Sequence, residues 1–501
     1  MNSGISKIDL LKSISFGESV AELEAEKLRD YFIETYYWNQ LKGGRVDIVY
    51  GLKGSGKSAI YSLININEPE LFQNNIIIKF AENPRGATVF SDLQADPPPS
   101  ERSFVSLWKI YLLSLLGEHI NSFGATTKDG RDVVQALKDS GFILETNPLK
   151  VFLGRATNYI KKYFNPESLT PNANFDEASG GLTGVGLKIT FAEPSDEQSK
   201  KGVRSIDTLL SKADAELRNC GFVIWFLLDR LDVAFAETPE LEQNALRALF
   251  KTYLDLAGCE FIRLKIFLRT DIWKAITKQG FREATHVQRA TTLKWDRGSL
   301  LNLIIKRFIS NKLLVEYYNV DVEMVSNSQE AQEKLFFEIF PDKVDTGNNP
   351  GTLDWIIGRV QDGSGYSSPR DIIILINCAI SNQIHSLEIG DGEPDGSAIF
   401  TRKCLKEALT AASKEKVEKF LYAEYPALSP YFDKLRGHKT RQTVETLSAI
   451  WSVSTRDAER IADDIVDAGV WKKEGGDPAE YWTMFVFRDG LDMVQGKEDI
   501  N

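Results

Sequence analysis

The chain has few residues of the kinds that build disulfide frameworks and metal centres. Its 501 residues include only four cysteines and four histidines. Cys220, Cys259, Cys378 and Cys404 lie far apart, with no C-x-x-C pair and no histidine at ligand spacing. We therefore expect buried, free thiols in a protein of a reducing compartment.

Long apolar runs are also missing. No stretch of 18 apolar residues occurs, and the first residues, MNSGISKIDLLKS, lack the apolar segment of a signal peptide. We expect a cytoplasmic protein with no membrane partner. An excess of basic residues is absent too, because 71 acidic residues outnumber 60 basic ones and the formal net charge is -11. This balance disfavours a protein that coats nucleic acid nonspecifically. It still allows a local basic groove that binds nucleic acid.

The most specific motif in the sequence is a glycine-rich loop. An apolar run over residues 46–50 stops at Gly51, and the sequence then reads LKGSGKS before a helical pattern begins. Gly51, Gly56, Lys57 and Ser58 fit G-x-x-x-x-G-K-[ST], in which backbone N–H groups at a helix N-terminus surround phosphates. The motif predicts a nucleotide site.

Five positions of this loop have an expected role. Gly51 makes the tight turn, while Gly54 and Gly56 let the backbone approach an anion without a Cβ in the way. Lys57 is expected to reach the β- and γ-phosphates, and Ser58 Oγ to bind Mg²⁺. ATP and Mg²⁺ are thus the expected cofactors, and the expected nucleotide-binding residues of the loop are Gly51, Leu52, Lys53, Gly54, Ser55, Gly56, Lys57, Ser58 and Ala59.

A helical pattern over residues 16–42 precedes the phosphate strand. It predicts an amphipathic helix, and two interpretations remain open. The helix can simply face the core. Alternatively, Phe16, Gly17 and the turn before the helix close over the adenine.

The run over 222–228 has seven consecutive apolar residues and predicts a strand that is buried on both faces. Asp229 follows it and is expected to hold the Mg²⁺ shell. Asp232 is either the base that polarises the attacking water or a cap of the next helix. Arg230 can pair with a phosphate or with a neighbouring subunit.

A further strand over 264–268 ends in Arg269, Thr270 and Asp271. Polar residues just past such a strand are where a site would sense the γ-phosphate. Thr270 is our candidate for that role. Either Thr270 or Asp271 can also cap the helix that follows.

Four more arginines are candidates for phosphate contacts. Arg370 follows Pro369 at the start of a predicted helix, where a positive charge is unfavourable for the helix dipole. One interpretation is that Arg370 contacts a phosphate from a lid domain. The other is that its side chain is simply exposed to solvent. Arg282, Arg289 and Arg297 lie close together in the sequence. One of them can reach a neighbouring subunit's nucleotide, although a solvated face explains any single one.

Residues 443–493 predict two helices and a β-wing, with Gly475 and Gly476 in the turn. This is a winged-helix pattern, with residues 454–466 as its recognition helix. Residues 431–501 hold 10 basic and 14 acidic residues. Strong DNA binding is therefore disfavoured, and a packing or protein-binding role is favoured.

In their order, the segments FGESVAE, YGLKGSGKSA, FLLDRLD, FLRTDIW, IIKRF and SSPRD resemble bacterial P-loop ATPases related to the STAND and origin-recognition (AAA+-like) groups. The resemblance implies an α/β fold: a parallel-sheet P-loop NTPase core of the additional-strand type, with strand order 5-1-4-3-2, a helical lid and a C-terminal winged-helix domain. It also assigns functional positions to six residues: Walker A to Lys57 and Ser58, Walker B to Asp229 and Asp232, sensor 1 to Thr270 and sensor 2 to Arg370.

The predicted organisation has four parts: an N-terminal helical segment over 1–42, an ATPase core over 43–298 with insertions around 81–103 and 165–203, a helical lid over 299–412, and a winged-helix-like domain over 413–501.

Three functions fit this organisation. The first is a Mg²⁺-dependent switch ATPase that controls self-association and a protein effector, as in bacterial antiviral defence. The others are a DNA-acting loader or motor and a nucleotide-binding scaffold with little turnover. The acidic charge favours the first over the second, and Asp232 argues against the third.

Overall fold

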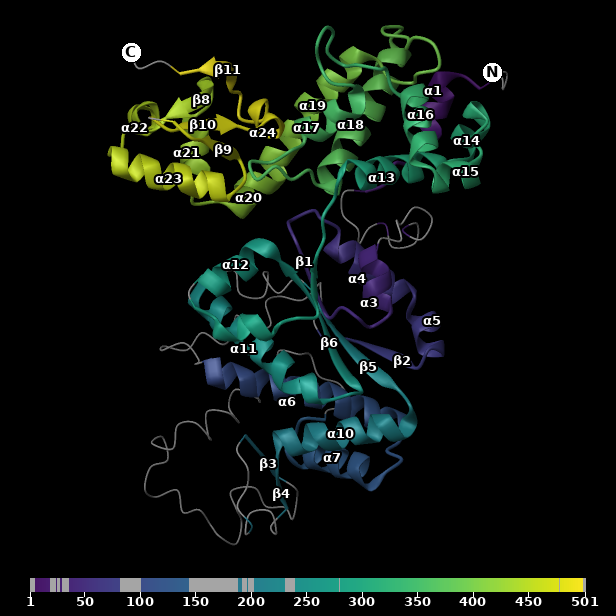
Figure 1. Cartoon of the computed structure of the whole chain (residues 1–501), viewed down its shortest axis with the longest axis vertical. Coiled ribbons are helices and arrows are strands. Elements are labelled where there is room, and N and C mark those ends of the chain that lie inside the picture. Colours follow the sequence, from purple (N-terminus) through teal and green to yellow (C-terminus); the bar gives the residue numbers. More distant parts are fainter. Residues whose placement is uncertain are drawn as a thin grey trace. The chain divides into compact units, whose positions relative to one another are not determined.

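The computed structural model describes residues 5–18, 24, 28, 36–81, 101–143, 188–191, 196, 202–229, 239–278, 280–476 and 478–498. The chain forms two compact units (Figure 1). The first comprises Met1–Glu34, Lys53–Ala59 and Lys294–Asn501, and the second comprises Thr35–Leu52 and Ile60–Leu293. Most of the glycine loop therefore belongs to the same unit as the residues predicted to form the lid.

A parallel five-stranded sheet is the centre of the second unit. Its neighbouring strands are, in order, β2 (Ile76–Phe80), β5 (Val223–Leu228), β6 (Ile262–Arg269), β1 (Ile48–Gly51) and β7 (Ala290–Thr292). All neighbours pair in parallel. When these five strands are numbered along the chain, the order is 5-1-4-3-2, so the strand order implied by the resemblance is confirmed.

Helices cover this sheet. One layer is formed by α6 (Glu101–Phe123), α7 (Lys128–Asp139), α10 (Ile206–Cys220) and α11 (Pro239–Asp255) (Figure 1). The unit also holds α3 (Tyr36–Lys42), α5 (Glu68–Gln73), α12 (Thr270–Lys278), the 3₁₀ helices η5 (Leu256–Gly258) and η6 (Arg282–His286), and most of α4 (Lys57–Ile66).

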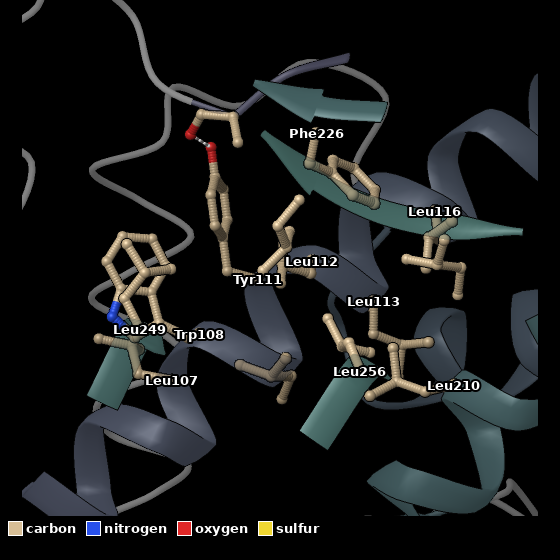
Figure 2. Close-up of a cluster of buried hydrophobic side chains, with 14 of the residues drawn as sticks. Leu107, Trp108, Tyr111, Leu112, Leu113, Leu116, Leu210, Phe226, Leu249 and Leu256 are labelled. Atoms are coloured by element: carbon tan, nitrogen blue, oxygen red, sulfur yellow. Dashed lines mark hydrogen bonds between the residues drawn. The ribbon is translucent and has the colours of Figure 1, made fainter. Parts of the chain in front are cut away.

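The helix α6 is buried over most of its circumference because its apolar residues face both the sheet and the neighbouring helices. Figure 2 shows Trp108, Tyr111 and Leu112 of α6 in the same cluster as Phe226 of β5. Trp108 Nε1 donates to the carbonyl of Ala245 in α11 at 2.9 Å, and Tyr111 Oη donates to the carbonyl of Ala81. Within the described part of the chain, no helix is both long and apolar enough to cross a membrane.

A pair of short parallel strands precedes α10. β3 (Lys188–Thr190) pairs in parallel with β4 (Val203–Ser205), which leads directly into α10. Residues 82–100 and 144–187, which include most of the predicted insertions, lie outside the described residues.

A buried ion cluster lies at the amino end of β1. Lys265 is in the middle of β6, is 0% exposed, and donates to Asp47 Oδ1 at 2.8 Å and to the carbonyl of Val46 at 2.7 Å. Its ammonium lies 4.3 Å from the centre of the Trp225 ring. Arg289 Nε is 2.8 Å from Asp47 Oδ2. Asp47 is therefore shared by two cations.

This cluster predicts a pH dependence of stability. Burial lowers the pKa of Lys265 from 10.5 to about 8, against the opposing attraction of Asp47. Between these two pH values the unfolded chain binds more protons than the folded one, so the free energy of unfolding rises with pH. We expect it to rise by up to about 1.4 kcal/mol per pH unit relative to Lys265→Met. Urea unfolding of both proteins across pH 7 to 11 measures this difference, and a constant difference would contradict it.

In the first unit, helices from both ends of the chain share one core. α1 (Lys7–Ser13) buries Leu10 and Leu11 in it, so this helix shares a core with residues of the predicted lid. The other helices of this core are α13 (Arg297–Ile309), α14 (Lys312–Tyr318), α15 (Val322–Asn327), α16 (Gln329–Ile339), α17 (Thr352–Arg359), α18 (Pro369–Glu388) and α19 (Arg402–Lys416).

The last part of this unit has its own core, in which Trp451 and Trp471 stack with ring centres 5.9 Å apart. It begins with a π-helical turn, η7 (Val417–Leu421), followed by α20 (Tyr422–Glu424), α21 (Ser429–Lys434), α22 (Val444–Trp451), α23 (Thr455–Asp467) and α24 (Phe485–Arg488). Its sheet has the order β11 (Val494–Lys497), β8 (Lys439–Thr443), β10 (Glu480–Thr483) and β9 (Trp471–Glu474). β10 ends at Thr483, and the residues that follow form α24.

All four cysteines are free, as expected. Cys404 is buried, but Cys220 is exposed, so the prediction of burial is wrong for Cys220. Cys220 is the last residue of α10, and Gly221 caps that helix in the left-handed conformation. A residue at such a helix end faces solvent even when the rest of the helix packs on the core.

Candidate nucleotide site

The glycine loop joins the end of β1 at Gly51 to the start of α4 at Lys57. Gly54 and Gly56 have φ angles of +77° and +94°, which side chains rarely tolerate. No described atom lies within 4 Å of a Cβ built on Gly56. Two of the predicted glycines thus adopt conformations that favour glycine, and neither carries a side chain that would cover the loop N–H groups needed for phosphate binding.

Lys57 and Ser58 are the first two residues of α4, and both are partly exposed. The first N–H groups of a helix have no intrahelical partners, and the helix dipole is positive at this end. The next turn of α4 is anchored by Ile60 and Tyr61, which are buried. A fixed helix start with a lysine and a hydroxyl is suited to holding phosphate and Mg²⁺.

The start of α18 lies against the same loop, within the first unit. A Cβ built on Gly54 would be 2.8 Å from Ser368 Oγ and 3.1 Å from Arg370 Cβ. Ser368 caps α18 by accepting from the Asp371 N–H at 3.1 Å. The structure therefore brings Arg370 beside the loop, and Gly54 is needed both for its backbone conformation and for this close approach.

Trp295 also holds the loop in place. Its Nε1 donates to the carbonyl of Ser55 at 2.9 Å, and the Ser55 side chain is buried. Trp295 comes shortly after β7, the last strand of the second unit, at the start of the stretch Lys294–Asn501 of the first unit. The loop backbone is therefore fixed by a residue that the sequence analysis did not assign to the site.

At the sheet of the second unit, polar residues follow the carboxyl ends of two strands. Asp229 comes directly after Leu228 of β5 and is 8% exposed. Thr270 follows β6, whose last residue, Arg269, pairs in register with Gly51 of β1. Because parallel strands end at the same edge, this is the edge at which the glycine loop begins.

Thr270 and its neighbours have different surroundings at this edge. Thr270 Oγ1 is buried and has no hydrogen-bond partner among the described residues, so it can accept a ligand contact. Arg269 instead binds Asp271, with Nε–Oδ1 and Nη2–Oδ2 distances of 3.1 and 2.7 Å. Burial opposes ionisation of Asp271, but the hydrogen bonds and charge of Arg269 outweigh it and lower the Asp271 pKa.

Phe16 does not take the predicted position over an adenine. Its side chain is 1% exposed and packs on Phe308, with ring centres 4.9 Å apart. The Phe16 carbonyl accepts from Arg307 at 2.6 Å, and the Gly17 carbonyl accepts from Asn377 at 2.7 Å. The structure corrects this prediction for Phe16, which belongs to the core of the first unit, while Gly17 lies beside that core and is partly exposed.

A buried ion pair explains the glycine at position 17. Arg307 donates to both carboxylate oxygens of Glu24 at 3.0 Å, and both side chains are almost fully buried. A Cβ on Gly17 would lie 1.9 Å from Glu24 Oε1 and 2.0 Å from Arg307 Nη1. Most of the helix predicted over 16–42 lies outside the described residues, and α3 forms its last part.

Two of the three arginines proposed to act across subunits have other partners. Arg289 precedes β7 at the amino edge of the sheet and binds Asp47, so it is at the wrong edge for a phosphate. Arg297 binds Asp354 at 2.8 Å and Glu333 at 2.5 Å. Arg282, in η6, is exposed and forms no ion pair with any described residue. Arg282 is thus the remaining candidate.

Asp232 and Arg230 lie outside the described residues, so their roles stay predictions. The structure adds contacts that the sequence did not suggest. Lys53 Nζ is 2.7 Å from Glu424 Oε2, although the two residues are 371 positions apart. Such a pair leaves no pattern in a single sequence, because neither residue belongs to a motif shared with the other.

Comparison with known proteins gives limited information. No family model and no curated protein matches the sequence. Among solved structures, the chain is similar to the Aeropyrum pernix ORC1 protein in complex with DNA, with 9% identity, a TM-score of 0.36 and 97% of each chain covered. It is also similar to the Aeropyrum pernix ORC2 protein in ADPNP–ADP complexes, with 9% identity, a TM-score of 0.31 and 95% and 96% coverage. For Cdc6p from Pyrobaculum aerophilum the identity is 11%, the TM-score 0.29 and the coverage 92% of each chain. TM-scores this low assign neither a family nor a function.

Proposed function

We propose that this chain binds ATP with Mg²⁺ and hydrolyses it. The observation that carries the proposal is the glycine loop, which joins β1 of a sheet of order 5-1-4-3-2 to α4, has Gly54 and Gly56 at positive φ, and has Arg370 of α18 beside Gly54. Loop N–H groups and Lys57 bind the phosphates, and Arg370 adds a second cation. Thr270, with its buried and unpartnered hydroxyl, senses the γ-phosphate.

The donor set fits Mg²⁺. Ser58 and Asp229 supply a hydroxyl and a carboxylate, which are the oxygen ligands that this ion prefers beside phosphates and water. When bound, the ion neutralises charge on the phosphates. Asp229 follows a strand that is buried from Ile224 to Leu228, so its position is set by the core rather than by solvent.

Asp232 is proposed as the base that orients the attacking water. We expect Asp232→Asn to keep ATP affinity and lower hydrolysis by about 10²-fold or more. Asn caps a helix about as well as Asp, so this change separates the two interpretations of Asp232. Phosphate release and calorimetry with ATP and Mg²⁺ give the two quantities. Glu237→Gln, which removes the same charge five residues further on, serves as control, and a wild-type rate in Asp232→Asn would mean that Asp232 is only a cap.

The ATPase is proposed to act as a switch on a protein partner. The order α21, β8, α22, α23, β9 and β10 supports a winged-helix domain, with α23 as its second long helix. The exposed residues of α23 include two arginines and four carboxylates, Asp457, Glu459, Asp464 and Asp467. Such a helix face repels a phosphate backbone and suits a basic protein surface. Control of an effector, as in bacterial antiviral defence, fits this charge better than loading onto DNA. If duplex DNA stimulated ATP turnover, the DNA-loading function would be supported instead.

A further inference from the structure

The glycine loop carries a second lysine whose partner comes from the C-terminal part of the chain. Lys53 Nζ lies 2.7 Å from Glu424 Oε2, and the Glu424 side chain is only 17% exposed while that of Lys53 is 40% exposed. Glu424 is the last residue of α20, which follows the π-helical turn η7. Turns of this kind are rare and are frequent at functional sites.

The π-helical turn contributes an aromatic ring to the same place. The centre of the Phe420 ring is 5.8 Å from Lys53 Nζ and 5.4 Å from Arg370 Cζ. Both distances are within the range of cation–π attraction. We name Lys53, Arg370, Phe420 and Glu424 the loop latch; all four residues belong to the first unit.

Both sides of the latch are connected to fixed structure. Lys416, the last residue of α19, is 2.5 Å from Asp371 in the first turn of α18. Tyr422, in α20, donates to Asp433 of α21 at 2.7 Å. The short segment 417–424 therefore joins helix α19, which is tied to α18, to helix α21 of the C-terminal part.

We propose that Glu424 is a positioning residue that sets the affinity of the glycine loop for ATP through Lys53, and thereby makes the segment 417–424 responsive to nucleotide. The proposal rests on the proposed function of the loop. A triphosphate beside Lys53 and Arg370 places negative charge near the Glu424 carboxylate. The two negative groups repel each other, and both compete for Lys53. Because Glu424 is mostly covered, solvent screens this repulsion only in part.

Coupling of this kind is reciprocal. If bound ATP weakens the contact between Lys53 and Glu424, then loss of that contact must strengthen ATP binding by the same factor. Removing the Glu424 charge is therefore expected to raise ATP affinity, whereas most changes near a binding site lower it. This direction distinguishes a coupled residue from one that only supports the fold.

The test compares Glu424→Gln with Glu418→Gln in the full chain. Glu418 is an exposed residue of the same π-helical turn, and its side chain makes no hydrogen bond or ion pair with the described residues, so it controls for loss of one charge. Calorimetry with ATP and Mg²⁺ gives the affinity for ATP. Hydrogen exchange of residues 417–424 measures how far the contacts of the loop latch are formed. We expect Glu424→Gln to bind ATP about three- to tenfold more tightly and Glu418→Gln to bind as the wild type does.

Hydrogen exchange in 417–424 should rise in the wild type when ATP is added, and should be high in Glu424→Gln before ATP is added. Phe420→Leu, which removes the ring but keeps an apolar side chain, should shift affinity in the same direction. Wild-type affinity in Glu424→Gln, together with exchange that ATP leaves unchanged, would overturn the latch while the loop still binds. Absence of ATP binding in every protein would overturn the proposed function and the latch with it.

Discussion

Lys57→Ala is expected to abolish tight ATP binding, with a loss of about a hundredfold or more. A charged hydrogen bond to phosphate contributes about 1.5–3 kcal/mol, and here the phosphates would also lose the cation fixed at the start of α4. The fold should survive, because α4 is anchored by Ile60, Tyr61, Leu63 and Ile64 rather than by Lys57. Calorimetry with ATP and Mg²⁺ measures the loss, and thermal unfolding checks the fold.

Lys42→Ala is a suitable control for this experiment. Lys42 ends α3, pairs with Glu70 at 2.6 Å and has no assigned role at the loop. Its removal takes the same charge from the protein surface and should leave ATP affinity unchanged. If Lys57→Ala bound ATP as tightly as the wild type, the glycine loop would not be the site.

The second large effect concerns assembly. We expect ATP turnover per subunit to rise with protein concentration, and Arg282→Ala to remove this rise while sparing ATP binding. An arginine supplied by a neighbouring subunit can add about 10³-fold or more to hydrolysis, because it stabilises the charge of the transition state. Arg282 is the candidate, since it is exposed and, unlike Arg289 and Arg297, forms no ion pair with a described residue.

Arg297→Ala is the matched control for Arg282→Ala. Arg297 is held by Asp354 and Glu333 in its own chain, so its loss should reduce stability and keep the dependence on concentration. Turnover is measured over a hundredfold range of protein concentration, with light scattering in saturating ATP. A rate that does not change with concentration, in a protein that stays monomeric, would rule out a shared site and favour a scaffold.

The core could be predicted from the sequence because its signals are local. The apolar run before Asp229 predicts a buried strand, and the residues after Tyr50 predict a phosphate-binding loop. The strand order followed from the resemblance. The position of Phe16 could not be predicted, since an aromatic residue before a helix fits either a core or a ligand. Burial of Phe16 depends on Phe308, which is far away in the sequence.

Interactions between distant residues account for the other failures. Arg289 looked like a free cation because its partner, Asp47, precedes a strand at the other end of the core sequence. Lys265 lay inside an apparently apolar strand, and only the register of β6 against β1 places it beside Asp47. The contact between Lys53 and Glu424 depends on how the C-terminal part folds back onto the loop, which no local pattern encodes.

The contact between Trp295 and Ser55 has a consequence for how this chain can be divided or recombined. The loop backbone is held by a residue that follows the last strand of the core sequence, and by the start of α18. A fragment that stops at residue 293 would keep the whole parallel sheet and lose these supports. Replacement of the C-terminal half by another sequence would likewise change the surroundings of the loop, and is expected to change its affinity for nucleotide.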